Sequence, residues 1–364
     1  MINRLSSRIL NAWYDREKHN RYLSQYPGSL MMKVATRKQN VAVIGAGIGG
    51  LCCARQLSAA GFSVRIFDKS RGVGGRVSVR RHQTDIAFDH GAQYFTVEDT
   101  EMAQQVESWL AAGVVAPWQC RMGSLDTGVW KPTNSETRHF VGVPDMTAIA
   151  KHLARDLELI LQTRVTSVAR HEHGWQLLGD EEWDLGIYDV LILNAPAPQS
   201  ASLLKNFPEF AQQIDAAKFA PCWSVMLAFD QPLDVPWDAA TVHDSPLSWI
   251  ARNSSKPGRP TRPDCWLLQG NPDWSNTHLE DVKEIVMAQL ISCFWEAIGL
   301  VPRPHRLADV HRWRFALPSE LLEQQYLFNE DLGVGACGDW CVGPRIESAY
   351  LSGLALAEEV RKRY

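Results

Sequence analysis

The chain has 364 residues, of which 45% are hydrophobic, and its formal net charge is −4 at pH 7. This length is typical of two domains, and the apolar content is sufficient for a substantial core. The slightly acidic balance and the lack of a long basic stripe argue against a nucleic-acid partner. No apolar run approaches the ~20 residues of a membrane-spanning helix, so we expect no association with a membrane.

Eight cysteines are scattered along the chain. They form no Cys-x-x-Cys pair and no Cys/His cluster with the spacing of a zinc site, so we expect no bound metal. Scattered cysteines in a chain of this size indicate reduced thiols and a cytoplasmic location.

The first predicted elements form a βαβ unit. Residues 1–38 are polar, lack the apolar stretch of a secretory signal and are interpreted as an N-terminal extension without assigned function, either a short surface helix or a disordered lead. A strand is predicted at 41–44, a helix at about 48–60 and a second strand at 63–67. This order predicts the opening of a doubly wound α/β domain.

A glycine cluster between this strand and helix is the strongest motif. Its residues are Gly45, Ala46, Gly47, Ile48, Gly49 and Gly50, which fit Gly-x-Gly-x-x-Gly in the context that dinucleotide binding requires. The first glycine permits a tight turn, the second lets a pyrophosphate approach the backbone, and the third lets helix and strand pack closely. The helix N-terminus offers free N–H groups to the phosphates. Asp68, after the second strand, is placed to accept hydrogen bonds from an adenosine ribose.

A second glycine-rich turn begins directly after Asp68. A plain NAD-binding fold does not need it, whereas FAD has an extended pyrophosphate and ribityl chain that need further backbone contact. Arg71 and Arg76 are placed to offset phosphate charge, and Lys69 and Gly75 belong to the same predicted loop. The sequence therefore predicts FAD as cofactor, and a solvated basic loop is the alternative.

The middle of the chain alternates between helical and strand patterns. Helices are predicted at 101–112, 146–157 and 279–298, strands at 158–168, 174–178, 189–194 and 223–230, and a Pro-rich loop at 253–264.

The C-terminal part repeats the arrangement of a strand, a glycine and a helix. A strand near 333–337 precedes Gly338 and Asp339, and Asp339 is suited to hold ribityl hydroxyls. Arg345 and Ile346 then open a helix whose N-terminus can face the flavin pyrimidine ring, where negative charge gathers on reduction. A doubly wound sheet can bring this last strand beside the first one.

These pieces, in this order, resemble the flavin amine oxidase superfamily and, within it, the bacterial renalases. The resemblance covers about residues 40–364. Glycine fingerprints are shared by many flavoproteins, but the strings at 90–96 and 244–253 are far more specific. The residues that carry the resemblance are 67–76, 90–96, 195–199, 244–253, 311–313 and 337–341.

The resemblance implies a p-hydroxybenzoate hydroxylase type of fold with noncovalently bound FAD. It also implies an oxidase that converts 2- or 6-dihydro isomers of NAD(P) into NAD(P)+ and passes the electrons to O2, giving hydrogen peroxide. By the same resemblance, FAD contacts fall on Gly45, Gly47, Gly50, Asp68, Arg76, Gly338, Asp339 and Ile346. The backbone of Val165 would meet the adenine, and Gln93, Tyr94 and Phe95 would lie near the flavin ring and the substrate.

Hydride transfer to a flavin needs no strong acid or base from the protein, so no catalytic residue is predicted. The site should instead be aromatic with a few polar orienting groups. Tyr94, Trp249 and Trp313 are the expected ring contacts, although most of the 14 tryptophans are expected in packing roles. Arg252 either meets a substrate phosphate or forms a surface ion pair.

The predicted FAD-binding domain comprises 39–95, 150–200 and 310–364, and the substrate domain comprises 96–149 and 201–309. The oligomeric state is left open. Alternatives are an amine oxidase, for which no lysine in a convincing site string is found, and a non-enzymatic flavin or nucleotide-binding redox partner. A desaturase of lipids or isoprenoids is a further alternative.

Overall fold

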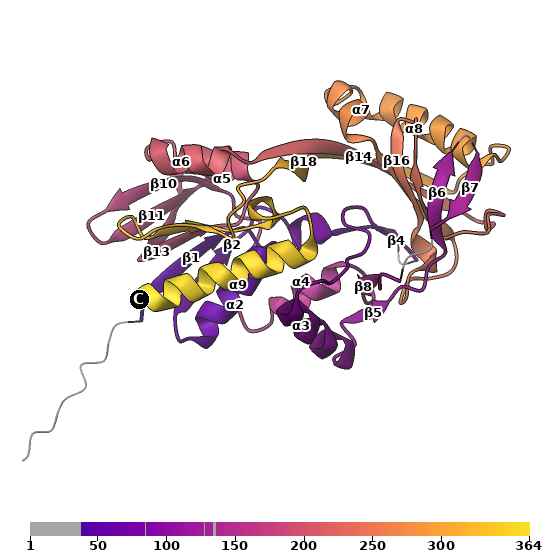
Figure 1. Cartoon of the computed structure of the whole chain (residues 1–364). Coiled ribbons are helices and arrows are strands. Elements are labelled where there is room, and N and C mark those ends of the chain that lie inside the picture. Colours follow the sequence, from indigo (N-terminus) through magenta and orange to yellow (C-terminus); the bar gives the residue numbers. More distant parts are fainter. Residues whose placement is uncertain (1–37, 84, 127, 134–135) are drawn as a thin grey trace, which may run out of the picture. The chain divides into compact units, whose positions relative to one another are not determined.

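The computed structural model of the chain describes residues 38–83, 85–126, 128–133 and 136–364 (Figure 1). The predicted N-terminal extension lies outside these residues, apart from Lys38. A six-stranded sheet contains the predicted βαβ unit, in the order β19-β20-β13-β1-β2-β9. Its strands are β1 (Asn40–Ile44), β2 (Ser63–Phe67), β9 (Glu158–Ile160), β13 (Val190–Leu193), β19 (Leu327–Asn329) and β20 (Val334–Ala336).

This sheet is parallel except for its edge strand β19. Its strands are buried on both faces, as the apolar runs predict. Val41 and Val43 pack in one core cluster, together with helices α2 (Ile48–Ala59) and α9 (Ile346–Arg363), which lie side by side (Figure 1). The carboxyl ends of β1, β2, β13 and β20 meet at one edge, where such folds bind their ligands.

The opposite face of the sheet is covered by a second core cluster, which contains Ala42 and Ile44. A three-stranded antiparallel sheet and two short helices contribute to it. These are β10 (Val165–His171), β11 (Gly174–Gly179), β12 (Asp184–Tyr188), α5 (Ala197–Leu203) and α6 (Pro208–Asp215).

A separate seven-stranded sheet has the order β18-β14-β17-β16-β15-β6-β7. Trp223, Val225 and Leu227 pack against helix α8 (Lys283–Ile298), and the intervening Met226 and Ala228 pack in another cluster. This alternation shows that both faces of the sheet are covered. Its strands are β6 (Met122–Asp126), β7 (Val129–Pro132), β14 (Lys218–Phe229), β15 (Ala239–Val242), β16 (Leu247–Arg252), β17 (Asp264–Gly270) and β18 (Leu307–Glu320).

The remaining elements connect the two large sheets. They are β3 (Val79–Gln83), β4 (Ile86–Asp89), α3 (Thr100–Ala111), β5 (Val115–Pro117), β8 (Phe140–Gly142), α4 (Thr147–Leu153) and α7 (Pro272–Thr277). Asp99 caps α3 by accepting hydrogen bonds from the backbone N–H groups of Glu101 and Met102, which fixes where that helix begins.

Three predicted elements differ from the observed ones. The predicted strand 158–168 is divided into β9 and β10, because Gln162 has a left-handed φ of 54°. The predicted helix 146–157 ends at Leu153, and the predicted helix 279–298 is α8 alone, preceded by the separate α7. The long strand β18 was not predicted, since its half-buried, charge-containing sequence becomes a strand only by pairing with β14.

Strand pairing also bears on the predicted domain boundaries. Residues 310–320 were assigned to the FAD-binding domain, but β18 pairs with β14 in the seven-stranded sheet. Conversely, Met102 and Val106 of α3 belong to the core cluster of the six-stranded sheet, although 96–149 was assigned to the substrate domain.

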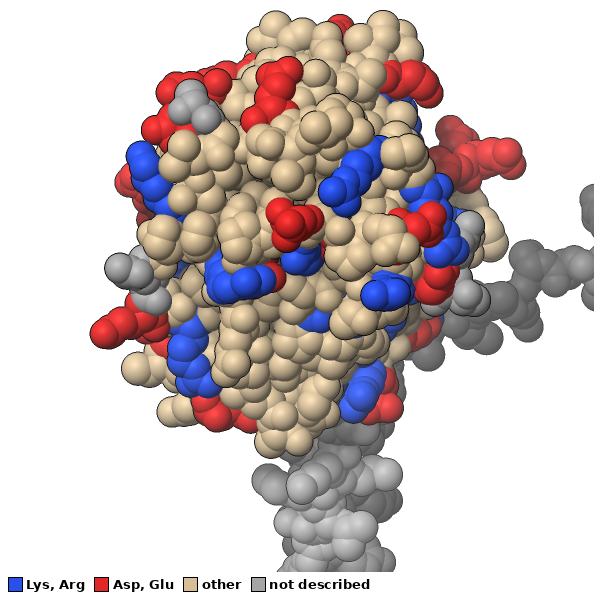
Figure 2. All heavy atoms as spheres, turned by 90° about the vertical axis from the view of Figure 1, so that its right-hand side faces the viewer, with Lys and Arg blue, Asp and Glu red and all other residues tan. Residues whose placement is uncertain are grey.

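In the described part of the chain, no helix is long and apolar enough to cross a membrane. Figure 2 shows a face on which basic and acidic side chains are interspersed, without a continuous basic stripe. All eight cysteines are free, and the described residues contain no group of three or more His, Cys, Asp or Glu side chains that could hold a metal.

Candidate functional site

The first glycine loop joins β1 to α2 and requires residues without side chains. A Cβ atom added to Gly50 would lie 2.3 Å from the carbonyl oxygen of Gly45, and Gly45 itself has a φ of +110°. Helix α2 begins without a side-chain cap and without an acidic residue in its first turn. Its first N–H groups and its positive dipole end are therefore suited to a phosphate.

The second glycine loop packs backbone to backbone against the first. The N–H of Gly74 donates to the carbonyl oxygen of Ala46 at 2.8 Å. A Cβ atom added to exposed Gly75 would have only one neighbour within 4 Å, the Cα of Gly47 at 3.7 Å. The two loops thus present a backbone surface with room for a pyrophosphate, which fits the predicted FAD.

Asp68 holds the two loops together at the end of β2. Its Oδ2 accepts a hydrogen bond from the N–H of Ala46 at 2.8 Å, and its Oδ1 accepts one from Ser70 at 2.7 Å. Because each carboxylate oxygen has a second lone pair, Asp68 can still accept from a ribose hydroxyl. The Asp68 carbonyl oxygen accepts from the N–H of Thr163, which places the start of β10 at Val165 close by, and the adenine contact of Val165 stays a prediction.

Arg76 and Asp339 are 263 residues apart and form a two-bond ion pair, with nitrogen–oxygen distances of 2.7 and 2.5 Å. The Asp339 side chain is only 10% exposed. The sequence predicted separate roles for these two residues, at a phosphate and at the ribityl chain. The structure brings them together, so both ends of the described chain converge on one place. Lys69 donates to the side chain of Gln199 at 3.3 Å, and Arg71 is exposed.

Asn194, which the sequence analysis missed, connects these parts. It follows β13, and its side-chain amide donates to the carbonyl oxygen of Cys337 at 2.8 Å. Its Oδ1 would lie only 2.9 and 2.8 Å from a Cβ atom added to Gly47 or Gly50. A polar residue at the carboxyl end of a buried parallel strand was the signal that could have identified it.

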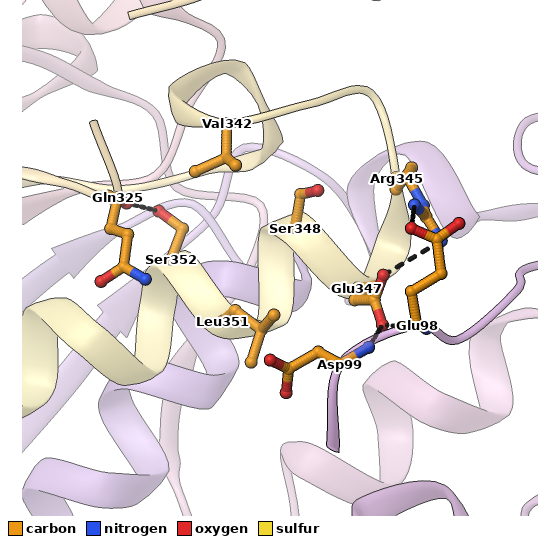
Figure 3. A pocket seen from close by; sticks show the side chains of 9 residues that line it. All are labelled: Glu98, Asp99, Gln325, Val342, Arg345, Glu347, Ser348, Leu351 and Ser352. Carbon is orange, nitrogen blue, oxygen red and sulfur yellow. Dashed lines mark hydrogen bonds and ion pairs between the residues drawn. The ribbon is translucent and has the colours of Figure 1, made fainter. Parts of the chain in front are cut away.

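The N-terminus of α9 is held by Arg345, whose guanidinium pairs with Glu98 at 2.8 Å and with Glu347 at 3.0 Å (Figure 3). It also donates to the hydroxyl of Thr96 at 3.1 Å. The side chain of Arg345 is therefore occupied within the protein, and an FAD contact at this helix end would fall to backbone groups near Ile346. Arg345, Glu98 and Glu347 border a pocket of about 370 Å³. Its other lining residues are Asp99, Gln325, Val342, Ser348, Leu351 and Ser352.

The segment that follows β4 runs beside the second glycine loop. The N–H of Ala92 donates to the carbonyl oxygen of Arg76 at 2.9 Å. A Cβ atom on Gly91 would lie 2.0 Å from that same oxygen. Since Arg76 also pairs with Asp339, the 91–95 segment continues directly from the predicted ribityl site, where the flavin ring would lie.

An aromatic cluster formed by Tyr94, Trp118, His139 and Trp249 adjoins this segment. The Tyr94 ring lies 4.7 Å from His139, 5.7 Å from Trp249 and 6.1 Å from Trp118, measured between centroids. Burial raises the pKa of Tyr94 and lowers that of His139, so both are neutral at pH 7. The indole N–H of Trp249 is buried and has no hydrogen-bond partner in the described part of the chain. Tyr94 and Trp249 were predicted as ring contacts, whereas Trp118 and His139 were not.

The side chains of two other predicted substrate residues have structural roles. Gln93 is buried, and its amide donates to the carbonyl oxygens of Asp89 and Gly91. Phe95 is 4% exposed and packs on Phe140. Both side chains are thus engaged in internal hydrogen bonding and packing, and the position of residues 93–95 near the flavin ring and the substrate stays a prediction.

Arg252 and Trp313 also differ from expectation. The Arg252 side chain pairs with buried Asp264 at 3.3 Å and donates to the carbonyl oxygen of Leu233 at 2.6 Å, so it is neither a substrate ligand nor a surface pair. Trp313 donates its indole N–H to the carbonyl oxygen of His90 at 2.9 Å, and its ring lies tilted against the His90 ring at a centroid distance of 4.9 Å. Burial lowers the pKa of His90 to about 3, so this histidine is neutral.

A buried charge cluster formed by Asp89, Lys256 and Arg259 contacts the side chain of Gln93. The Lys256 ammonium donates to Asp89 Oδ2, Gln93 Oε1 and Asn253 Oδ1 at 3.1, 3.1 and 3.3 Å. Arg259 donates to the same Asp89 oxygen at 2.7 Å. Burial acts to raise the pKa of Asp89, but the two cations outweigh it and lower that pKa, while burial lowers the pKa of Lys256 to about 8.

The sequence showed no lysine in a convincing site string, but the structure brings Lys256 into contact with Gln93, one of the predicted site residues. Lys256 lies in the polar, Pro-rich stretch 253–264, which is a loop between β16 and β17 as predicted. Polar composition suggested a solvated lysine, but the loop folds inward and leaves the side chain 0% exposed. The ion pair with Asp89, 167 positions earlier, and the hydrogen bonds to Gln93 and Asn253 compensate this burial.

Comparison with known proteins places this site in a family. Residues 43–108 match the model of an NAD(P)-binding Rossmann-like domain, and residues 127–361 match that of flavin containing amine oxidoreductases. A zeta-carotene-forming phytoene desaturase of Myxococcus xanthus is 44% identical over 45 residues, which are 12% of this chain and 9% of the desaturase. A 4,4'-diapolycopene oxygenase of Methylomonas sp. is 42% identical over 59 residues, or 16% of this chain and 12% of that protein. The chain thus matches about a tenth of the length of these curated relatives.

Solved structures share the fold across nearly the whole chain. An oxidoreductase from Methanosarcina mazei has a TM-score of 0.66 at 13% identity, covering 88% of this chain and all of that one. Putrescine oxidase bound to putrescine has a TM-score of 0.66 at 12% identity, covering 90% and 99%. Because the amine oxidoreductase model matches most of the sequence, the chain belongs to the flavin containing amine oxidoreductases, a family of FAD-dependent oxidoreductases.

Proposed function

We propose that the protein oxidises isomeric reduced nicotinamide dinucleotides, with the hydride at the 2- or 6-position of the ring, to NAD(P)+ and hydrogen peroxide. The observation that carries this proposal is the neutral aromatic cluster beside the 91–95 segment. A flat dihydropyridine ring can stack on such a surface. We also propose the p-hydroxybenzoate hydroxylase type of arrangement for the two large sheets.

FAD, when bound, supplies the acceptor of two electrons and returns them to O2. The balanced reaction consumes one dihydronicotinamide, one O2 and one proton, and yields one NAD(P)+ and one H2O2. Because the ring becomes aromatic on losing hydride, the protein needs to supply position rather than a strong acid or base. The aromatic cluster is consistent with this requirement, since His139 and Tyr94 are both neutral.

Trp249 offers a specific polar contact within the cluster. Its indole N–H is buried without a partner among the described residues, and an unpaired buried donor costs about 1–3 kcal/mol. The carboxamide oxygen of a nicotinamide ring is an acceptor that would satisfy this donor. The contact would orient the ring on the cluster.

The cofactor is proposed to be bound without a covalent link. Cys337 and Cys341 are both two positions from Asp339 and both fully buried, and burial raises the pKa of Cys341 to about 12. A thiol in this state is a poor nucleophile. Denaturation with acid should therefore release all of the FAD into the supernatant, which absorbance measures directly.

The test of function is anaerobic mixing of the FAD-loaded protein with 2- and 6-dihydroNAD(P), followed by flavin absorbance. We expect rapid bleaching with one or both isomers, slow bleaching with ordinary 4-dihydroNAD(P), and one H2O2 per NAD(P)+ when O2 is admitted. A flavin that stays oxidised with both isomers would refute the proposal.

An amine oxidase is the second candidate, and buried Lys256 favours it. A lysine whose pKa is lowered to about 8 can exchange a proton near neutral pH, which amine oxidation uses and hydride transfer from a dihydropyridine does not. The same anaerobic assay with putrescine and simple primary amines decides between the two. Bleaching by amines together with no bleaching by dihydronicotinamides selects this candidate.

A further inference from the structure

The buried charge cluster contains more positive than negative charge. The Lys256, Arg259 and Asp89 side chains are 0%, 4% and 1% exposed, and both cations share one Asp89 oxygen. Other acids of the surrounding elements have cations of their own. Among the described residues, Asp145 pairs with Arg81, Asp238 with Arg121, and Asp264 with Arg252. Among the described residues, the cluster of two cations and one carboxylate therefore carries one uncompensated positive charge next to Gln93.

This charge is close to the aromatic cluster. The Lys256 ammonium lies 5.5 Å from the centroid of the Trp118 ring, and that ring lies 6.1 Å from Tyr94. The same ammonium donates to Gln93, the neighbour of Tyr94 in the chain. Since the ammonium and Trp118 are buried, salt screens their field much less than it screens surface charges.

An aromatic cluster ordinarily attracts cations through the negative faces of its rings. Here the protein's own Lys256 already lies over Trp118. A second cation on the cluster would gain little from that ring and would be repelled by the ammonium. A neutral ring loses nothing, because its stacking depends on contact area and shape.

We propose that Lys256 is a specificity-determining residue, which makes the aromatic cluster selective for neutral rings and against cationic ones. The inference rests on the proposed function for the identity of the ring. A dihydronicotinamide ring is neutral, whereas the product pyridinium and an alkylammonium ion are cations. The same charge would therefore leave binding of the neutral substrate ring unaffected, assist release of the oxidised product and disfavour protonated amines.

The test compares two rings of nearly equal shape, neutral nicotinamide and cationic 1-methylnicotinamide, by perturbation of the flavin absorbance of FAD-loaded protein. At distances comparable to the 5.5 Å between the Lys256 ammonium and the Trp118 ring centroid, a buried unit charge changes the affinity for a charged ligand on the order of tenfold. We expect the wild type to bind nicotinamide about tenfold more tightly, and Lys256→Met to reduce that ratio to within about twofold. Lys362→Met removes an exposed lysine paired with Glu358 on α9 and should leave the ratio unchanged.

A measurement on the wild type covers the case in which Lys256→Met does not fold. Raising the pH from 7 to 9 should strengthen binding of the cationic ring several-fold and leave nicotinamide binding unchanged, because Lys256 loses its proton. The other groups that face it keep their state: Asp89 and His139 have lowered pKa values, Tyr94 has a raised one, and burial raises that of Cys120 to about 11. The Arg259 guanidinium stays charged.

The outcomes separate this inference from the proposed function. Equal binding of both rings by the wild type, or an unchanged ratio in folded Lys256→Met, overturns the charge selection only. A wild type that binds neither ring overturns the ring site itself and the proposed function with it. An affinity for the cationic ring that does not change between pH 7 and 9 also overturns the assignment to Lys256.

Discussion

Gly50→Ala tests whether close backbone approach in the first glycine loop determines FAD binding. The new methyl group would lie 2.3 Å from the carbonyl oxygen of Gly45 and 2.8 Å from the side-chain oxygen of Asn194. Ordinary contact begins at 3.4 Å, so the helix and the loop must separate by about 1.1 Å, the difference between 3.4 and 2.3. Overpacking of this kind costs about 1–3 kcal/mol.

The same shift moves the N–H groups at the start of α2, and we expect FAD affinity to fall by about 10- to 100-fold. The assay is titration of the apoprotein with FAD, together with the ratio of bound FAD to protein after purification. Gly72→Ala is the matched control, because a Cβ atom there meets nothing within 4 Å and its φ is not positive. If both variants bind FAD with the same dissociation constant, the close-approach argument is wrong.

Three further predictions concern charges and polar groups of the site. Asp339→Asn removes the partner of Arg76 and should weaken FAD binding by about tenfold, as measured by titration, whereas unchanged affinity would show that the pair is dispensable. Trp249→Phe removes an unpaired buried donor, so we expect thermal stability to be kept or raised while KM for the dihydronicotinamide rises about tenfold; an unchanged KM would contradict the proposed contact. The pKa of Lys256 is lowered to about 8 in the folded state, so the unfolded chain binds the extra proton between pH 8 and 10.5. The free energy of unfolding of the wild type, relative to Lys256→Met, should therefore rise over that interval in denaturant titrations, and a fall would refute the assigned direction.

The FAD half of the site was accessible from sequence because its signals are local. Gly45, Gly47 and Gly50 lie within six residues, and the strand and helix that flank them show why the turn between requires glycine. Asp68 follows directly from the same βαβ unit. Asp339 was identifiable because it follows the last predicted strand, and parallel strands place their carboxyl ends at one edge.

The other half of the site was decided by tertiary structure. Arg252 and Gln93 are residue types that often bind ligands, yet in the fold both side chains have partners within the protein. Lys256 lies in a polar loop and was expected to be solvated, yet it is buried, and Asp89 and Gln93 compensate its burial. The periodicity of apolar residues indicates which face of a helix or strand is buried, but it does not indicate which distant polar group contacts that face.

The amino-acid sequence by itself thus determined the dinucleotide-binding domain, its cofactor and the convergence of its two ends, because short-range backbone geometry and strand order suffice for these. Only the tertiary structure decided that Trp118 and His139 join Tyr94, and that a charged cluster lies behind them. Such contacts join residues more than 20 positions apart and depend on the pairing of strands such as β5 and β8, beside which Trp118 and His139 lie. Their free energy comes from burial and charge compensation between distant segments, which no local pattern records.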